Sequence, residues 1–151
     1  MNKSQIEIIS HSSFQTKRLG EFLGREILKK KRKSSLVIGL RGDLGGGKTT
    51  FLKGLARGLG IKEKILSPTF IIFRHYEIKN KNFKKFYHFD CYRIENEKDL
   101  LNLGLKEIFS KPENIIALEW SEKIETQLPR GCLIIELKFV NQKTRKINIK
   151  R

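Results

Sequence analysis

A glycine-rich segment in the first third of the chain has the residue types and the spacing of a phosphate-binding loop. Residues 42–49 read Gly-Asp-Leu-Gly-Gly-Gly-Lys-Thr, which matches G-x-x-x-x-G-K-[ST] at every fixed position. Main-chain N–H groups must wrap the phosphates, and glycines let the backbone curl and approach closely enough to do so. We expect Lys48 to reach the β- and γ-phosphates of ATP and the Thr49 hydroxyl to bind Mg²⁺. The predicted nucleotide contacts in this segment are Gly45, Gly46, Gly47, Lys48, Thr49 and Thr50.

Hydrolysis of a bound nucleotide also needs a carboxylate near the metal and the attacking water. The usual place is the end of an apolar strand, and the apolar run 115–118 ends in Glu119, where Asp is commoner. Glu119 is therefore predicted to hold Mg²⁺ through water. The alternative is a surface glutamate at a strand end. Trp120, the only tryptophan, packs either beside the site or in the core.

A second candidate acid lies in the segment 87–93, which reads Tyr-His-Phe-Asp-Cys-Tyr-Arg. His88, Asp90 and Tyr92 are two positions apart, so a strand would place them on one face. Such a polar face indicates a cleft in which Asp90 orients water or the hydrated metal and His88 supports it. An exposed face of an edge strand is the other interpretation, and the residues leave both open.

The segment Ser67-Pro68-Thr69-Phe70 lies between the loop's helix and the next predicted strand. In P-loop hydrolases a segment at this place can be a switch that the γ-phosphate and Mg²⁺ order, and a threonine hydroxyl suits that role. The start of a strand is an equally good interpretation of the same residues.

The elements that position these groups follow from hydrophobic periodicity and turn residues. A helix capped by Ser12 or Ser13 should carry an apolar stripe of Leu19, Phe22, Leu23, Glu26 and Ile27. A second helix should leave the glycine-rich loop over 48–59, and a short third one over 97–103 should close at Gly104. Strands are predicted over 5–9, 36–40, 70–78, 84–92, 115–118, 133–140 and 145–150. The sum is an α/β fold with parallel central strands and antiparallel hairpins attached.

Composition limits the class of protein. A chain of 151 residues suits one domain, residues 1–151. Its apolar runs are far too short to span a bilayer, and Cys91 and Cys132 show no zinc spacing, so we expect a reduced, cytoplasmic protein. Lysine and arginine number 32 against 16 acids, a net charge of +16 that favours polyanions. A lysine-biased proteome explains the same excess, and the one tight run, 29–33, also suits the end of a helix.

Taken together, these segments resemble the TsaE (YjeE) family, small P-loop ATPases of bacterial tRNA threonylcarbamoyladenosine biosynthesis. The resemblance covers nearly the whole chain in order, and the combination is far more specific than the phosphate loop alone. It implies a three-layer α/β/α fold with a mixed sheet, weak Mg²⁺-dependent ATPase activity, and a complex with the proteins TsaB and TsaD. In that complex TsaD modifies adenosine 37 of tRNA and the ATPase resets it for repeated turnover. The matching segments are 42–50, 67–70, 87–93, 103–104, 118–120 and 128–129.

The resemblance also assigns residues. It makes Lys48, Asp90 and Glu119 catalytic, gives Thr49 and Glu119 to the metal, and puts Thr69 in the switch-like segment. Thr16 matches a family position near the adenine, and Arg145 would border the nucleotide. The family commonly has alanine at the position of Gly46, and the chain departs most from the family after Pro129. The high positive charge suggests contact with tRNA, indirect or through weak basic contacts, or with an acidic partner.

Two other classes of function stay open at this stage. A small-molecule kinase would need an arginine-bearing lid and an acceptor pocket, and no arginine-rich insertion follows the core. A non-hydrolytic module would use ATP only as a conformational ligand. A GTPase is disfavoured because the chain lacks the N-K-x-D guanine signature.

Overall fold

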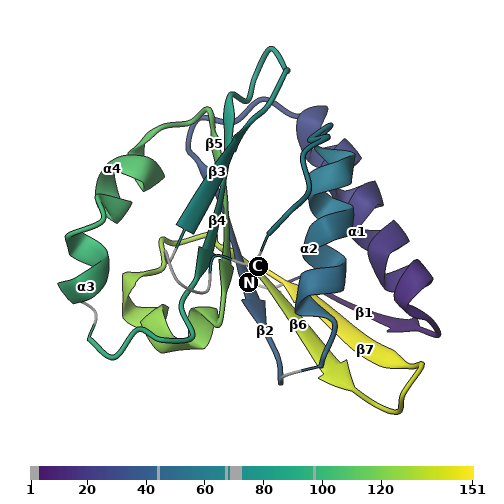
Figure 1. Cartoon of the computed structure of the whole chain (residues 1–151). Coiled ribbons are helices and arrows are strands. Elements are labelled where there is room, and N and C mark those ends of the chain that lie inside the picture. Colours follow the sequence, from purple (N-terminus) through teal and green to yellow (C-terminus); the bar gives the residue numbers. More distant parts are fainter. Residues whose placement is uncertain (1–3, 44, 67, 69–72, 97) are drawn as a thin grey trace.

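One mixed sheet organises the protein. The computed structural model describes residues 4–43, 45–66, 68, 73–96 and 98–151. In these residues the seven strands run in the order β1-β7-β6-β2-β5-β4-β3 (Figure 1). The strands are β1 (Gln5–Ser10), β2 (Leu36–Arg41), β3 (Phe73–Glu77), β4 (Lys85–Asp90), β5 (Asn114–Glu119), β6 (Leu133–Phe139) and β7 (Arg145–Lys150). The helices are α1 (Ser13–Leu28), α2 (Lys48–Gly58), α3 (Lys98–Leu101), α4 (Leu105–Ser110) and the 3₁₀ helix η1 (Ser121–Gln127).

The predicted mixture of parallel and antiparallel pairing is confirmed. Strands β6, β2, β5 and β4 are parallel neighbours. Strand β3 pairs antiparallel with β4, and β7 pairs antiparallel with both β6 and β1. Because the four central strands run the same way, their carboxyl ends meet at one edge of the sheet. The expected hairpin strand over 70–78 appears as β3, and its residues 70–72 lie outside the described part of the chain.

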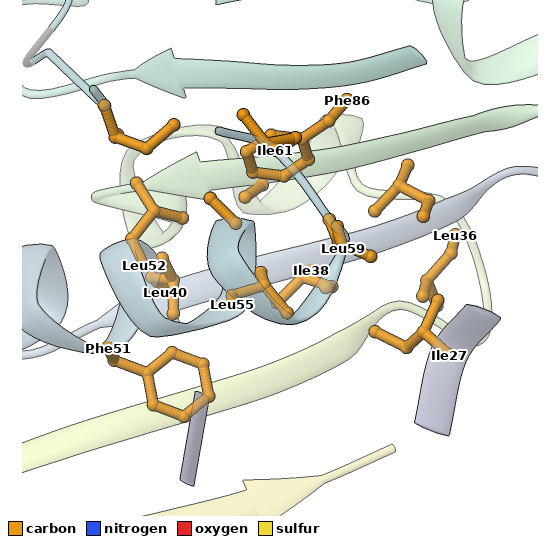
Figure 2. Packing of buried hydrophobic residues seen from close by; sticks show 14 of the residues in the cluster. Ile27, Leu36, Ile38, Leu40, Phe51, Leu52, Leu55, Leu59, Ile61 and Phe86 are labelled. Atoms are coloured by element: carbon orange, nitrogen blue, oxygen red, sulfur yellow. The ribbon is translucent and has the colours of Figure 1, made fainter. Parts of the chain in front are cut away.

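Helices cover both faces of the sheet and so create two cores. Figure 1 shows α1 and α2 on one face and α3 and α4 on the other. In β2, Ile38 and Leu40 point into the core beneath α1 and α2, whereas Val37 belongs to the opposite core. Figure 2 shows Leu52 and Leu55 of α2 lying against these β2 side chains. A strand buried on both faces needs apolar residues at consecutive positions, which explains the run 36–40.

The packing of α1 corrects the predicted stripe. Ser12 caps the helix by accepting a hydrogen bond from the Gln15 N–H, as expected. Of the predicted stripe, Ile27 is buried and Leu19 and Leu23 pack against the core, but Phe22 is 63% exposed. The rest of the buried face consists of Thr16, Gly20 and Gly24. A Cβ on Gly20 would lie 2.2 Å from the Phe51 carbonyl oxygen of α2. The two helices meet backbone to backbone through glycines, which a hydrophobicity pattern does not register.

Helix α4 and the 3₁₀ helix η1 were not predicted. The helix expected over 97–103 is confirmed by α3 (Lys98–Leu101), but Gly104 was expected only to end that helix. Gly104 has φ +73° and also begins α4, and η1 follows directly after Trp120. Elements this short give too few turns for helical periodicity to be recognised. Both cysteines are free, and among the residues described no helix combines the length and apolar character that crossing a membrane requires.

The backbone contact between α1 and α2 gives a test of stability. A Cβ added at Gly54 would lie 2.0 Å from the Lys17 carbonyl oxygen. We expect Gly54→Ala to lower the free energy of unfolding by about 2 kcal/mol, because overpacking outweighs the helix preference of alanine. Urea unfolding measures the change. The control Lys53→Ala, at an exposed position of α2, should stay within about 0.5 kcal/mol of wild type. A Gly54→Ala protein as stable as wild type would contradict this packing.

Candidate functional site

A cavity of about 890 Å³ lies where the glycine-rich loop meets the carboxyl ends of β4 and β5. The ten residues assigned from the sequence to the nucleotide, the metal or catalysis all line it, although they come from five separate parts of the chain. They are Thr16, Gly45, Gly46, Gly47, Lys48, Thr49, Thr50, Asp90, Glu119 and Arg145. Ser67 and Thr69 of the predicted switch segment lie outside the described residues.

The loop is shaped by close contact with β6. A Cβ at Gly42, which has φ +135°, would lie 2.1 Å from the Leu137 carbonyl oxygen, and one at Gly46 would lie 2.9 Å from the same atom. Gly46 also donates its N–H to the Asp43 carbonyl oxygen at 2.9 Å, which tightens the turn. Gly47 then begins α2 without a side-chain cap. The first N–H groups of α2 therefore stay available to an anion in the cavity.

Lys48 is held inside the loop that it follows. Its side chain is only slightly exposed, and Nζ donates to the Gly42 carbonyl oxygen and, at 3.2 Å, to that of Asp43. The ammonium also lies 4.0 Å from the centroid of the Trp120 ring. Burial lowers the pKa of Lys48, and nearby carboxylates, Glu119 foremost, oppose that decrease. Phosphate oxygens would be stronger acceptors for this ammonium than the carbonyls that now hold it.

Glu119 ends β5 and faces α2. Its Oε1 lies 3.4 Å from Thr49 Oγ1, and its Oε2 lies 3.0 Å from His88 Nε2. The residue is 5% exposed, so the interpretation as a surface glutamate is wrong. A hydroxyl and a carboxylate are the kind of ligand that Mg²⁺ takes beside phosphate oxygens and water. The donor set and the glycine cradle next to it therefore fit a magnesium nucleotide.

Asp90 ends β4 directly beside Glu119 in the parallel register. Its Oδ1 accepts a hydrogen bond from the Tyr92 N–H at 3.0 Å. Burial raises the pKa of Asp90, and the Glu119 carboxylate adds to the increase, while the Tyr92 N–H opposes it. Strand β4 lies between β5 and β3, and His88 is 1% exposed, so the interpretation as an exposed edge-strand face is wrong. His88 was expected to support Asp90, but its hydrogen bond goes to Glu119.

Thr16 and Arg145 form the other side of the cavity. Thr16 Oγ1 lies 2.7 Å from Ser10 Oγ and 3.3 Å from the Ser12 carbonyl oxygen, so its hydroxyl already has partners. Arg145 donates from Nε to the Gly45 carbonyl oxygen at 3.2 Å, and its guanidinium lies 4.7 Å from the Phe139 ring centroid. Arg145 thus links β7 to the glycine-rich loop.

Several further residues line the cavity. Trp120, which the sequence left open between site and core, borders it with φ +58°, an unusual backbone conformation for a residue other than glycine. Its position directly after Glu119 was the available signal. Gln142 and Lys143 come from the turn between β6 and β7, and no sequence signal pointed to them. The remaining lining residues are His11, Ser12, Ser13, Asp43 and Tyr92.

Comparisons with known proteins agree on one family. A family model described as "Threonylcarbamoyl adenosine biosynthesis protein TsaE" matches residues 10–147. The tRNA threonylcarbamoyladenosine biosynthesis protein TsaE of Treponema pallidum (strain Nichols) is 34% identical over 141 residues, 93% of this chain and 97% of that protein. The protein of the same name from Bacillus subtilis (strain 168) is 44% identical over 111 residues, 74% of this chain but only 66% of that protein. A crystal structure of YdiB from Bacillus subtilis superposes with a TM-score of 0.77 at 32% identity, covering 99% of this chain and 87% of that one.

Because the pKa of Asp90 is raised, we expect its charged carboxylate to lower the free energy of unfolding near neutral pH. A carboxyl whose pKa is raised by folding binds its proton more tightly in the folded chain, so folding loses stability as pH rises above the ordinary value of 3.8. Asp90→Asn keeps an oxygen for the Tyr92 N–H and removes the buried charge. We expect this variant to be more stable than wild type near neutral pH, and the gain to disappear as pH falls towards 3.8. Urea unfolding over a pH series measures both effects.

Asp99→Asn, at an exposed position of α3, is the matched control and should change the free energy of unfolding by less than about 0.5 kcal/mol. An Asp90→Asn protein less stable than wild type near neutral pH would contradict the assigned environment of Asp90.

Proposed function

This chain belongs to the TsaE family of threonylcarbamoyl adenosine biosynthesis proteins, and from that premise we propose that it binds and hydrolyses ATP with Mg²⁺. The observation that carries the proposal is the single cavity into which the sheet and α2 bring Lys48, Thr49, Asp90 and Glu119. Residues 1–151 would form one ATPase domain, with the cavity as its active site.

Binding rests on the loop and on α2. The polyphosphate would lie against the main-chain N–H groups of residues 45–49, at the uncapped N-terminus of α2. Lys48 would exchange the carbonyl oxygens of Gly42 and Asp43 for phosphate oxygens. Because the ammonium is already buried at the loop, little further desolvation is needed when it turns to the phosphates. Thr16, Thr50 and Arg145 would border the rest of the nucleotide.

Hydrolysis rests on the two acids and Thr49. Mg²⁺, when bound, neutralises charge on the phosphates, and the Thr49 hydroxyl and the Glu119 carboxylate would hold it there. Asp90 lies beside Glu119 and has a raised pKa, so it is the better placed of the two to orient the attacking water and take its proton. Trp120 and Tyr92, whose rings lie 5.0 Å apart, would shield this end of the cavity from bulk water.

The cellular role we propose is that of an accessory subunit in the cytoplasmic machinery that makes threonylcarbamoyladenosine in tRNA. The relatives carry that process in their names. Hydrolysis by this chain would drive turnover of a TsaB–TsaD transferase rather than perform the transfer itself. The net charge of +16 would help the assembly approach tRNA, indirectly or through weak contacts.

Loss of the Lys48 ammonium should weaken nucleotide binding. A hydrogen bond from a charged group contributes about 1.5–3 kcal/mol, so Lys48→Ala should raise the Kd for Mg²⁺–ATP by about 10- to 100-fold. Isothermal titration calorimetry measures the Kd. Lys53→Ala serves as the control, because Lys53 lies on the same helix but does not line this cavity. A Lys48→Ala protein with unchanged affinity would refute the site.

Glu119→Gln should separate binding from hydrolysis. We expect ATP affinity within a few-fold of wild type and phosphate release slower by about 100-fold or more, because the amide is a poor ligand for Mg²⁺. Glu113→Gln, at a half-buried position just before β5 that does not line the cavity, is the control. The assay follows inorganic phosphate, ADP and any phosphorylated small molecule. Inorganic phosphate as the sole phosphoryl product supports an ATPase, whereas a phosphorylated acceptor would favour a kinase.

A further inference from the structure

We propose that His88 is a positioning residue for Glu119: it holds one oxygen of this carboxylate and so fixes the orientation in which the other oxygen faces Thr49 and the metal. The inference rests on the proposed ATPase function and names a residue on which that function depends. His88 does not itself line the cavity, so it would act only through Glu119.

The strand register places the imidazole against the carboxylate. Asp90 pairs with Glu119 across β4 and β5, and His88 lies two positions before Asp90 on the same face. The imidazole therefore contacts Glu119 from the neighbouring strand β4, whereas the Thr49 hydroxyl contacts it from α2. The contacts divide the carboxylate: Oε2 lies 3.0 Å from His88 Nε2, and Oε1 lies 3.4 Å from Thr49 Oγ1.

Burial makes the His88 contact the stronger of the two. The side chains of His88 and Glu119 are 1% and 7% exposed, and a buried carboxylate needs hydrogen-bond donors in place of water. Thr49 is exposed, and its hydroxyl would leave Oε1 for a metal. Without the donor at His88, Oε2 would lose its partner. The terminal torsion of a glutamate is broad, so the carboxylate would then be free to turn.

The contact with Glu119 is the hydrogen bond that orients the His88 ring, because the other ring nitrogen, Nδ1, makes none among the described residues. His88 Nδ1 is buried and has no hydrogen-bond partner within the described part of the chain. An apolar side chain would fill this interior position without leaving a polar atom unpaired. Histidine differs by supplying a donor at Nε2, and that donor is directed at Glu119. The geometry thus gives the imidazole the role of a partner that orients a metal ligand.

Replacement by two amides of different length tests this role. The amide nitrogen of His88→Gln reaches about as far as Nε2, whereas that of His88→Asn falls short. We expect His88→Gln to stay within about threefold of wild type and His88→Asn to bind metal about 10- to 100-fold more weakly. The readout is binding of Mn²⁺ to the full chain with a non-hydrolysable ATP analogue, followed by electron paramagnetic resonance. Affinity for the analogue without metal should be unchanged in both variants.

Phosphate release gives a second readout, in which His88→Asn should lower kcat and leave the KM for ATP within a few-fold. Equal Mn²⁺ affinity and equal kcat in the Gln and Asn variants would overturn the inference. Equal losses in both variants, tracking a loss of stability in urea, would overturn it too, because they would indicate a structural role. If wild type itself neither bound Mn²⁺ with the analogue nor released phosphate, the proposed function would fail, and the inference with it.

Discussion

The close approach of the 42–47 loop to the main chain of β6 is the constraint on which the site depends. At Gly42, which has φ +135°, a Cβ would lie 2.1 Å from the Leu137 carbonyl oxygen, so only glycine can follow this path there, and Gly46 comes almost as close to the same atom. The tight path leads directly into α2 at Gly47 and leaves the N-terminus of that helix uncapped. A patch of main-chain donors thus faces the cavity before any ligand arrives, which is the pre-organisation that anion binding requires.

The sheet adds the acids to this cradle. Because β4 and β5 are parallel and in register, Asp90 and Glu119 end side by side at the edge where α2 begins. Two neighbouring carboxylates, one buried and one half-buried, repel each other and lose hydration, which costs free energy of folding. Each of the two has its own hydrogen-bond partners. Glu119 has the His88 imidazole and the Thr49 hydroxyl as partners, whereas Asp90 accepts a hydrogen bond from the Tyr92 main-chain N–H and has a raised pKa. Different environments for adjacent acids are typical of catalytic sites in which each acid has its own role.

Much of this could be predicted from the sequence, and the exceptions have physical reasons. The loop pattern, the apolar run ending in Glu119 and the alternation around Asp90 are local signals, and each places its residue in the cavity. The contact between α1 and α2 at Gly20 and Gly54 was not predicted, because this close packing depends on glycines, which a hydrophobicity pattern does not register. The pairing of His88 with Glu119 rather than Asp90 depends on which strands are neighbours, which a single sequence does not fix. Helix α4 was missed because it is short, and Gln142 and Lys143 because a turn reaches the cavity only after β6 and β7 have joined the sheet.

If the proposed function holds, main-chain N–H groups of the glycine-rich loop bind a polyphosphate. Titration of the ¹⁵N-labelled protein with Mg²⁺–ADP, followed through its amide resonances, tests it directly. We expect the largest shifts on Gly45, Gly46, Gly47 and Lys48, and we expect that magnesium chloride alone does not reproduce them. Saturable binding that leaves these four amides unmoved while others shift would contradict it.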